Sequence, residues 1–208
     1  MTFAERVAAL RRWLNPGPID TAAELQKFLD ERGAFVAQKS IVAYCQMKTR
    51  TYLLDLLKEK AFQEAFDRSR WESYAIVLSD LLIIVDGDLG TGLMEEDRAI
   101  LARRMGEMYR AILDGHPRPA HRPEGWGDAF EAFDRRLALA RLAPPKPVLE
   151  VASHSAEQLF VLLPIHPSLR ARDGMSVEGG VRFLIAAATD ALTQRMRREP
   201  LIADLLGR

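Results

Sequence analysis

The sequence predicts an all-α protein: a single-domain bundle of seven or eight helices around a central pair at about residues 34–58 and 71–86. Residues 21–86 contain no proline and one glycine, Gly33. Apolar side chains in this stretch recur at helical spacing and make more apolar surface than one isolated helix can hide. The remaining segments must therefore pack on it.

Composition narrows the class of protein. The chain has 208 residues, a length that fits one domain, and it is 48% hydrophobic and 28% charged, as in ordinary globular proteins. Lys plus Arg equals Asp plus Glu at 29 each, so no global field attracts nucleic acid or an anionic membrane surface. No apolar run reaches the roughly 18 residues of a membrane span. With one cysteine, Cys45, and no secretory signal, we expect a soluble cytoplasmic protein without a cofactor.

The first two expected helices begin with the same signal. Thr2 with Glu5, and Thr21 with Glu24, fit the capping-box pattern. The first of these helices covers residues 2–14 and forms an amphipathic arm. Gly33 costs about 1 kcal/mol inside a helix relative to Ala, so we interpret it as a break before the helix at 34–58.

Residues 71–86 are expected to form the most central helix. Its polar positions share one narrow stripe, which is typical of a helix covered on several sides, and we place Asp80 in that stripe, facing solvent. The alternative is a buried strand at 81–85, since β-branched runs suit strands. We prefer a helix because no alternating partner strand lies nearby.

Residues 87–92 are expected to form a loop. The run from Asp86 to Gly92 resembles the phosphate-1 loop of the actin and Hsp70 ATPases, in which a strand ends in an Asp-x-Gly-Thr turn. Those families have a far longer chain and a first βββ unit, which this sequence lacks. We therefore interpret the run as a turn between helices, with glycine supplying positive φ.

The second half contains a helix with Met105 and Met108, a long irregular segment at 116–127, and a Pro-rich linker at 144–147. The linker separates a main bundle, 1–143, from a C-terminal helical unit, 148–208, that packs on it within one domain. Ser155 is predicted to start a short helix in this unit, and a longer helix follows residue 175.

One stretch is a candidate anion site. Three arginines surround the start of the last long helix, Ser176 can cap that helix, and two glycines lie in its first turn; the arginines and glycines are Arg170, Arg172, Arg182, Gly179 and Gly180. Free N–H groups at a helix start together with arginines favour anion binding. The alternative is that the glycines let another helix pack closely and the arginines are solvated.

Three functional hypotheses follow. The first is a non-catalytic protein that acts by binding, as a homodimer whose second copy covers the narrow polar stripes. The second is a pocket for a small amphipathic acid or phosphate-bearing ligand, with an apolar floor of Tyr52, Met105 and Met108. The third is a hydrolase-like enzyme whose acid–base groups come from His154, His166 and Asp80. No metal site is expected, because the one close histidine pair, at 116 and 121, has no thiolate near it.

Overall fold

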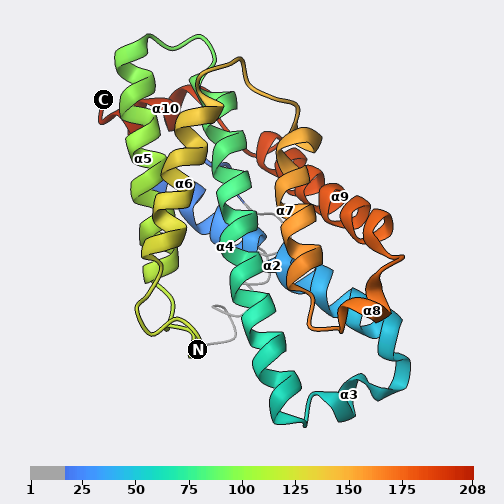
Figure 1. Cartoon of the computed structure of the whole chain (residues 1–208). Coiled ribbons are helices and arrows are strands. Elements are labelled where there is room, and N and C mark those ends of the chain that lie inside the picture. Colours follow the sequence, from blue (N-terminus) through green and yellow to red (C-terminus); the bar gives the residue numbers. More distant parts are fainter. Residues whose placement is uncertain (1–16) are drawn as a thin grey trace, which may run out of the picture.

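The computed structural model describes residues 17–208, which fold as the predicted all-α bundle (Figure 1). The elements in chain order are α2 (Ala22–Thr49), η1 (Arg50–Tyr52), α3 (Leu53–Leu56), α4 (Lys60–Gly90), α5 (Glu95–Asp114), α6 (Gly127–Ala140), α7 (Val148–Leu162), α8 (Pro167–Arg170), α9 (Gly174–Thr193) and α10 (Arg198–Leu206). The expected helix at 2–14 lies outside the described residues. Between residues 17 and 208 no strand forms, and one isolated bridge joins Ile19 to Met196.

Helix α4 is the centre of the bundle. It runs through the middle of the molecule, with α5 and α6 on one side and α7 and α9 on the other (Figure 1). Helices α2, α5, α6, α7 and α9 all pack against it, and α9 also packs against α7 and α2. The predicted central pair is confirmed as α2 and α4, and α4 extends beyond both predicted ends. The predicted C-terminal end of the first helix, at residue 58, is wrong, because α2 starts earlier and stops at Thr49, where Arg50 has a positive φ of 50° and the chain continues as η1 and α3.

The expected break at Gly33 is wrong, because α2 is continuous through this residue. Gly33 is buried where α2 meets α4, and a Cβ there would lie 3.3 Å from Cε2 of Tyr74 and 3.7 Å from Cβ of Leu78. Glycine lets the two helices approach closely. The favourable packing of α2 against α4 therefore outweighs the low helix propensity of Gly33, on which the expected break was based.

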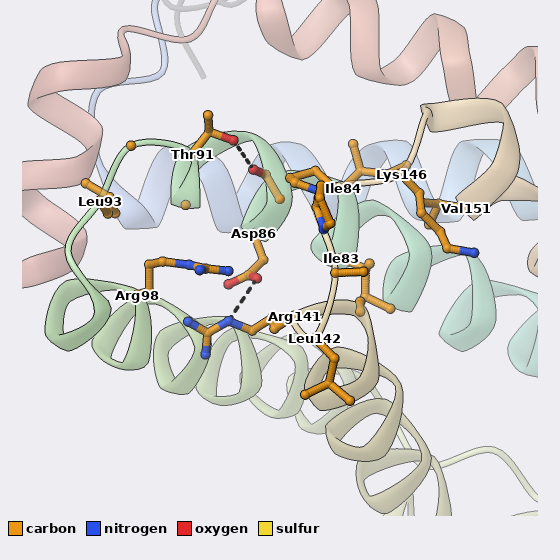
Figure 2. Close-up of a pocket in the computed structure, with 17 residues that line it drawn as sticks. Ile83, Ile84, Asp86, Thr91, Leu93, Arg98, Arg141, Leu142, Lys146 and Val151 are labelled. Atoms are coloured by element: carbon orange, nitrogen blue, oxygen red, sulfur yellow. Dashed lines mark hydrogen bonds and ion pairs between the residues drawn. The ribbon is translucent and has the colours of Figure 1, made fainter.

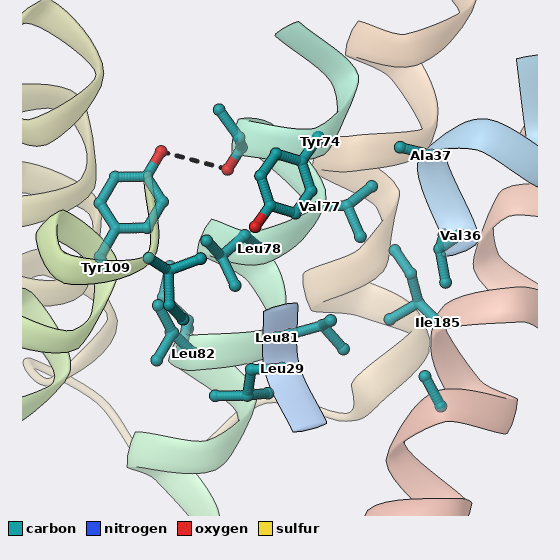
Figure 3. Packing of buried hydrophobic residues seen from close by; sticks show 14 of the residues in the cluster. Leu29, Val36, Ala37, Tyr74, Val77, Leu78, Leu81, Leu82, Tyr109 and Ile185 are labelled. Atoms are coloured by element: carbon teal, nitrogen blue, oxygen red, sulfur yellow. Dashed lines mark hydrogen bonds between the residues drawn. The ribbon is translucent and has the colours of Figure 1, made fainter. Parts of the chain in front are cut away.

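The capping box at the start of α2 is confirmed. The hydroxyl of Thr21 accepts a hydrogen bond from the backbone N–H of Glu24, whose carboxylate accepts one from the N–H of Thr21. The preference for helix over strand at 81–85 is also confirmed. Leu81 and Leu82 lie in the core that α4 shares with α2, α5 and α9 (Figure 3).

The expected loop at 87–92 is wrong over residues 87–90, because α4 continues to Gly90. Asp86 and Gly87 are therefore helical, which removes the likeness to a phosphate-binding turn after a strand. The chain turns at Gly92, whose φ of 83° requires glycine. None of the helices in residues 17–208 is long and apolar enough to cross a membrane.

Two glycine substitutions test the packing at these helices. Gly180 lies inside α9, and a Cβ there would meet no heavy atom within 4 Å. Gly180→Ala should raise the free energy of unfolding by about 0.5–1 kcal/mol. Gly33→Leu should lower it by about 1–3 kcal/mol through overpacking against Tyr74. Urea denaturation measures both, and a destabilising Gly180→Ala would show that something outside residues 17–208 covers this position.

Candidate functional site

The predicted anion site at the start of α9 is spread over several environments. Arg170 is buried, donates from its guanidinium to the carbonyl of Val161 at 2.9 Å, and lies over the ring of Phe160. It therefore joins α8 to the end of α7. Arg172 is exposed, and Arg182 is half-buried without an ion-pair partner among residues 17–208.

The glycines of this stretch do not pack against another helix of the described chain. Gly179, like Gly180, has no heavy atom within 4 Å of a Cβ position. Ser176 is exposed, and the N-cap of α9 is Asp173, so Ser176 does not cap the helix. Ser176 and Gly180 line a hollow of about 290 Å³ between α2 and α9, and the three arginines do not.

The predicted apolar floor is divided between two parts of the molecule. Tyr52 is 70% exposed and directly precedes α3, whereas Met105 and Met108 are buried in α5. Figure 1 shows α3 and α5 on opposite sides of the bundle. These three side chains therefore do not form one pocket.

Asp80 has an environment opposite to the one predicted, because it is completely buried. The guanidinium of Arg136, in α6, donates to Oδ1 of Asp80 at 2.5 Å. Ser155, in α7, donates to Oδ2 from its backbone N–H at 2.9 Å and from its hydroxyl at 2.5 Å. The expected helix start at Ser155 is also wrong, since α7 begins at Val148. The polar stripe of α4 is thus covered here by α6 and α7 of the same chain.

The structure brings together two of the three predicted acid–base residues. Nδ1 of His154 lies 3.8 Å from Oδ1 of Asp80, and burial lowers the pKa of His154. His166 instead accepts a hydrogen bond from the N–H of Ser168 and caps α8. The hydroxyl of Ser155 is buried and engaged with Asp80, so it is not an accessible nucleophile.

A cavity of about 430 Å³ lies at the C-terminal end of α4 (Figure 2). It is bounded by α4, by the turn to α5, by α5 itself, by the α6–α7 connection and by the first turns of α7. The polar side chains that line it are Asp86, Thr91, Arg98, Arg141 and Lys146, and the larger apolar ones are Ile83, Ile84, Leu93, Leu142 and Val151.

Two arginines approach one buried carboxylate in this cavity. Asp86 is 5% exposed, and its Oδ2 lies 3.6 Å from Nε of Arg141, which follows α6. The guanidinium of Arg98, in α5, is directed toward the same carboxylate (Figure 2). Burial raises the pKa of Asp86, while the charges of Arg141 and Arg98 oppose the shift. Among residues 17–208, neither Oδ1 of Asp86 nor Nε of Arg141 has a hydrogen-bond partner.

The Pro-rich segment 144–147 supplies one wall of the cavity. Pro145 lies against α4 at Gly87, where an added Cβ would be 3.1 Å from Cβ of Pro145. Lys146 is paired with Glu150 at the start of α7. Gly87 thus allows the connection to lie directly on the central helix and to close the cavity on that side.

Sequence reasoning missed this site for a physical reason. Asp86 is the last residue of the expected helix at 71–86, and the arginines near it come from segments farther along the chain. Two sequence patterns mark this site. One is an acidic residue followed by glycines at the end of the most apolar helix, and the other is an arginine beside a Pro-rich segment. Those patterns give no distance between the two segments.

The chemistry of the cavity suits an anion with an apolar part. Two guanidinium groups face one carboxylate, and the rest of the wall is mainly aliphatic. In the described part of the chain, no three His, Cys, Asp or Glu side chains are grouped so that they could hold a metal ion. Cys45 is buried in α2, and burial raises its thiol pKa to about 11, which makes it unreactive.

Comparisons of the chain with models of protein families, with curated proteins and with solved structures found no match.

The two aspartates of α4 should respond oppositely to neutral replacement. Asp80→Asn removes a fully hydrogen-bonded carboxylate and should lower the free energy of unfolding at pH 7 by about 3 kcal/mol. Asp86→Asn should raise it, because the raised pKa of Asp86 means that its ionised form is destabilised in the folded protein. The protonated Asp86 side chain stabilises the folded protein only at low pH. This stabilisation is lost as the pH rises through the pKa that Asp86 has in the folded protein. Urea denaturation at neutral pH compares the variants, and destabilisation by both would contradict the distinction.

Proposed function

We propose that this protein binds a small amphipathic acid in the cavity formed by Asp86, Arg98 and Arg141. The observation that carries the proposal is the convergence of two guanidinium groups on a single buried carboxylate at the wall of a cavity that also has an aliphatic surface. Binding rather than catalysis is proposed because residues 17–208 place no nucleophile beside a general base in this cavity.

A neighbouring ion pair shows what a purely structural arrangement looks like in this fold. Asp80 and Arg136 also join α4 to α6, and the Asp80 carboxylate accepts three hydrogen bonds. Asp86 and Arg141 join the same two segments but leave one donor and one acceptor unpaired. A buried unpaired polar group costs about 1–3 kcal/mol. A ligand carboxylate supplies the acceptor that Nε of Arg141 lacks.

The remaining walls fit an aliphatic ligand body. Ile83 and Ile84 of α4, Leu93 of the turn before α5 and Val151 of α7 present apolar surface to the cavity from three different parts of the chain. The volume of about 430 Å³ falls within the range of small-molecule pockets. Each methylene that is removed from water there contributes about 0.8 kcal/mol, so a short alkyl chain adds affinity to that of the charged group.

Titration calorimetry with octanoate tests the proposal. Arg98→Gln and Arg141→Gln should each weaken octanoate binding by about tenfold or more, since a hydrogen bond to a charged group contributes about 1.5–3 kcal/mol. The control is Arg103→Gln, at an exposed arginine of α5 that lies outside the cavity and pairs with Glu107. It should leave the affinity unchanged.

The uncharged analogue octanol separates this site from general hydrophobic adsorption. Octanol should bind at least tenfold more weakly than octanoate to the wild-type protein. Equal affinities for the two probes, or an affinity for octanoate that survives both cavity substitutions, would contradict an arginine-based acid site.

We also propose self-association through α9 and α2. Phe183 of α9 and Met47 of α2 line the hollow between these helices and are 70% and 53% exposed. Met175, in the first turn of α9, is 88% exposed. A second copy of the chain is the proposed occupant. With a formal net charge of zero, two copies approach without net repulsion.

Light scattering coupled to size exclusion tests this second proposal. The wild-type protein should elute as a dimer at high micromolar concentration, and Phe183→Glu should shift it toward the monomer. Leu54→Glu, at an equally exposed apolar residue of α3, is the matched control and should not. If the wild-type protein elutes as a monomer under these conditions, the proposed self-association is wrong.

A further inference from the structure

The ion pair between Asp86 and Arg141 is geometrically incomplete, which bears on how an anion can bind. The separation of 3.6 Å between Oδ2 of Asp86 and Nε of Arg141 is longer than a hydrogen bond. Each partner also keeps one buried polar atom without a hydrogen bond in residues 17–208. The cavity therefore holds a carboxylate that is close to its arginines without fully engaging them.

The charges around Asp86 come from each element that packs there. Arg98 of α5 faces it and also lies 3.6 Å from the exposed carboxylate of Glu95. Arg141 faces it from the α6–α7 connection, and Lys146 of the same connection is paired with Glu150 of α7. On α4 itself, Asp88 is directed to Arg198 of α10. Arg98 is thus already shared between Asp86 and Glu95, and an incoming carboxylate must share Arg98 and Arg141 with Asp86.

We propose that Asp86 takes up one proton from solvent when an anionic ligand binds, and that its carboxyl group then donates a hydrogen bond to the ligand. This inference rests on the proposed acid-binding function. Two carboxylates at one buried site cannot both remain ionised at low cost. Asp86 is the partner suited to accept the proton, because burial already raises its pKa. No other bond forms or breaks, and the ligand remains the anion held by Arg98 and Arg141.

The inference makes ligand affinity depend on pH in a defined way. Over the pH range in which Asp86 is ionised in the free protein and protonated in the complex, the Kd for octanoate should rise about tenfold for each pH unit. Calorimetry in two buffers of different ionisation enthalpy should count close to one proton taken up per octanoate. Asp86→Asn should bind octanoate with no proton uptake and with a Kd that does not change with pH.

Two further measurements identify which group takes up the proton. 1-Octanesulfonate is ionised throughout this range, so it should show the same proton uptake as octanoate if Asp86 is the acceptor, and none if the proton resides on the ligand. His154→Gln, outside the cavity, should leave the uptake unchanged. Octanoate binding with equal pH dependence in the wild type and in Asp86→Asn would overturn this inference and leave the acid-binding function standing. Failure of octanoate to bind the wild-type protein at all would overturn both.

Discussion

The enclosure of α4 by its own chain is the constraint from which the rest of the architecture follows. A helix covered on several sides cannot leave its polar side chains to water, so those groups need partners from the surrounding helices. Arg136 and Ser155 meet this need for Asp80. They thereby fix how α6 and α7 lie on the central helix. One turn and a half further along α4, the same kind of pairing is left incomplete at Asp86, and a cavity opens there.

The fold class could be predicted from the sequence because helical periodicity and capping are local properties. The hydrogen bonds of Thr21 and the helical state of residues 81–85 depend mainly on neighbours in the chain. Gly33 was misinterpreted because its role depends on Tyr74, which reaches it only when α2 and α4 pack together. Asp80 was placed in solvent for a similar reason, since its partner Arg136 lies 56 residues away.

The candidate site could be predicted only as a kind of chemistry. An acid held by arginines was expected, but at the start of α9, where the glycines and arginines are clustered in sequence. In the structure Arg170 serves packing between α7 and α8, and the converging arginines are instead Arg98 and Arg141. They come from separate segments, and only the arrangement of the helices around α4 determines that both face Asp86.

The contact between Pro145 and Gly87 has a consequence for how this scaffold could be modified. The wall that Pro145 helps to form is a short connection outside the helices, and it is anchored by shape rather than by a ladder of backbone hydrogen bonds. Replacing residues 142–146 would thus alter the size of the cavity while leaving the hydrophobic core intact. The size of the cavity and the stability of the core thus depend on different segments of the chain, so the first can be varied with little effect on the second.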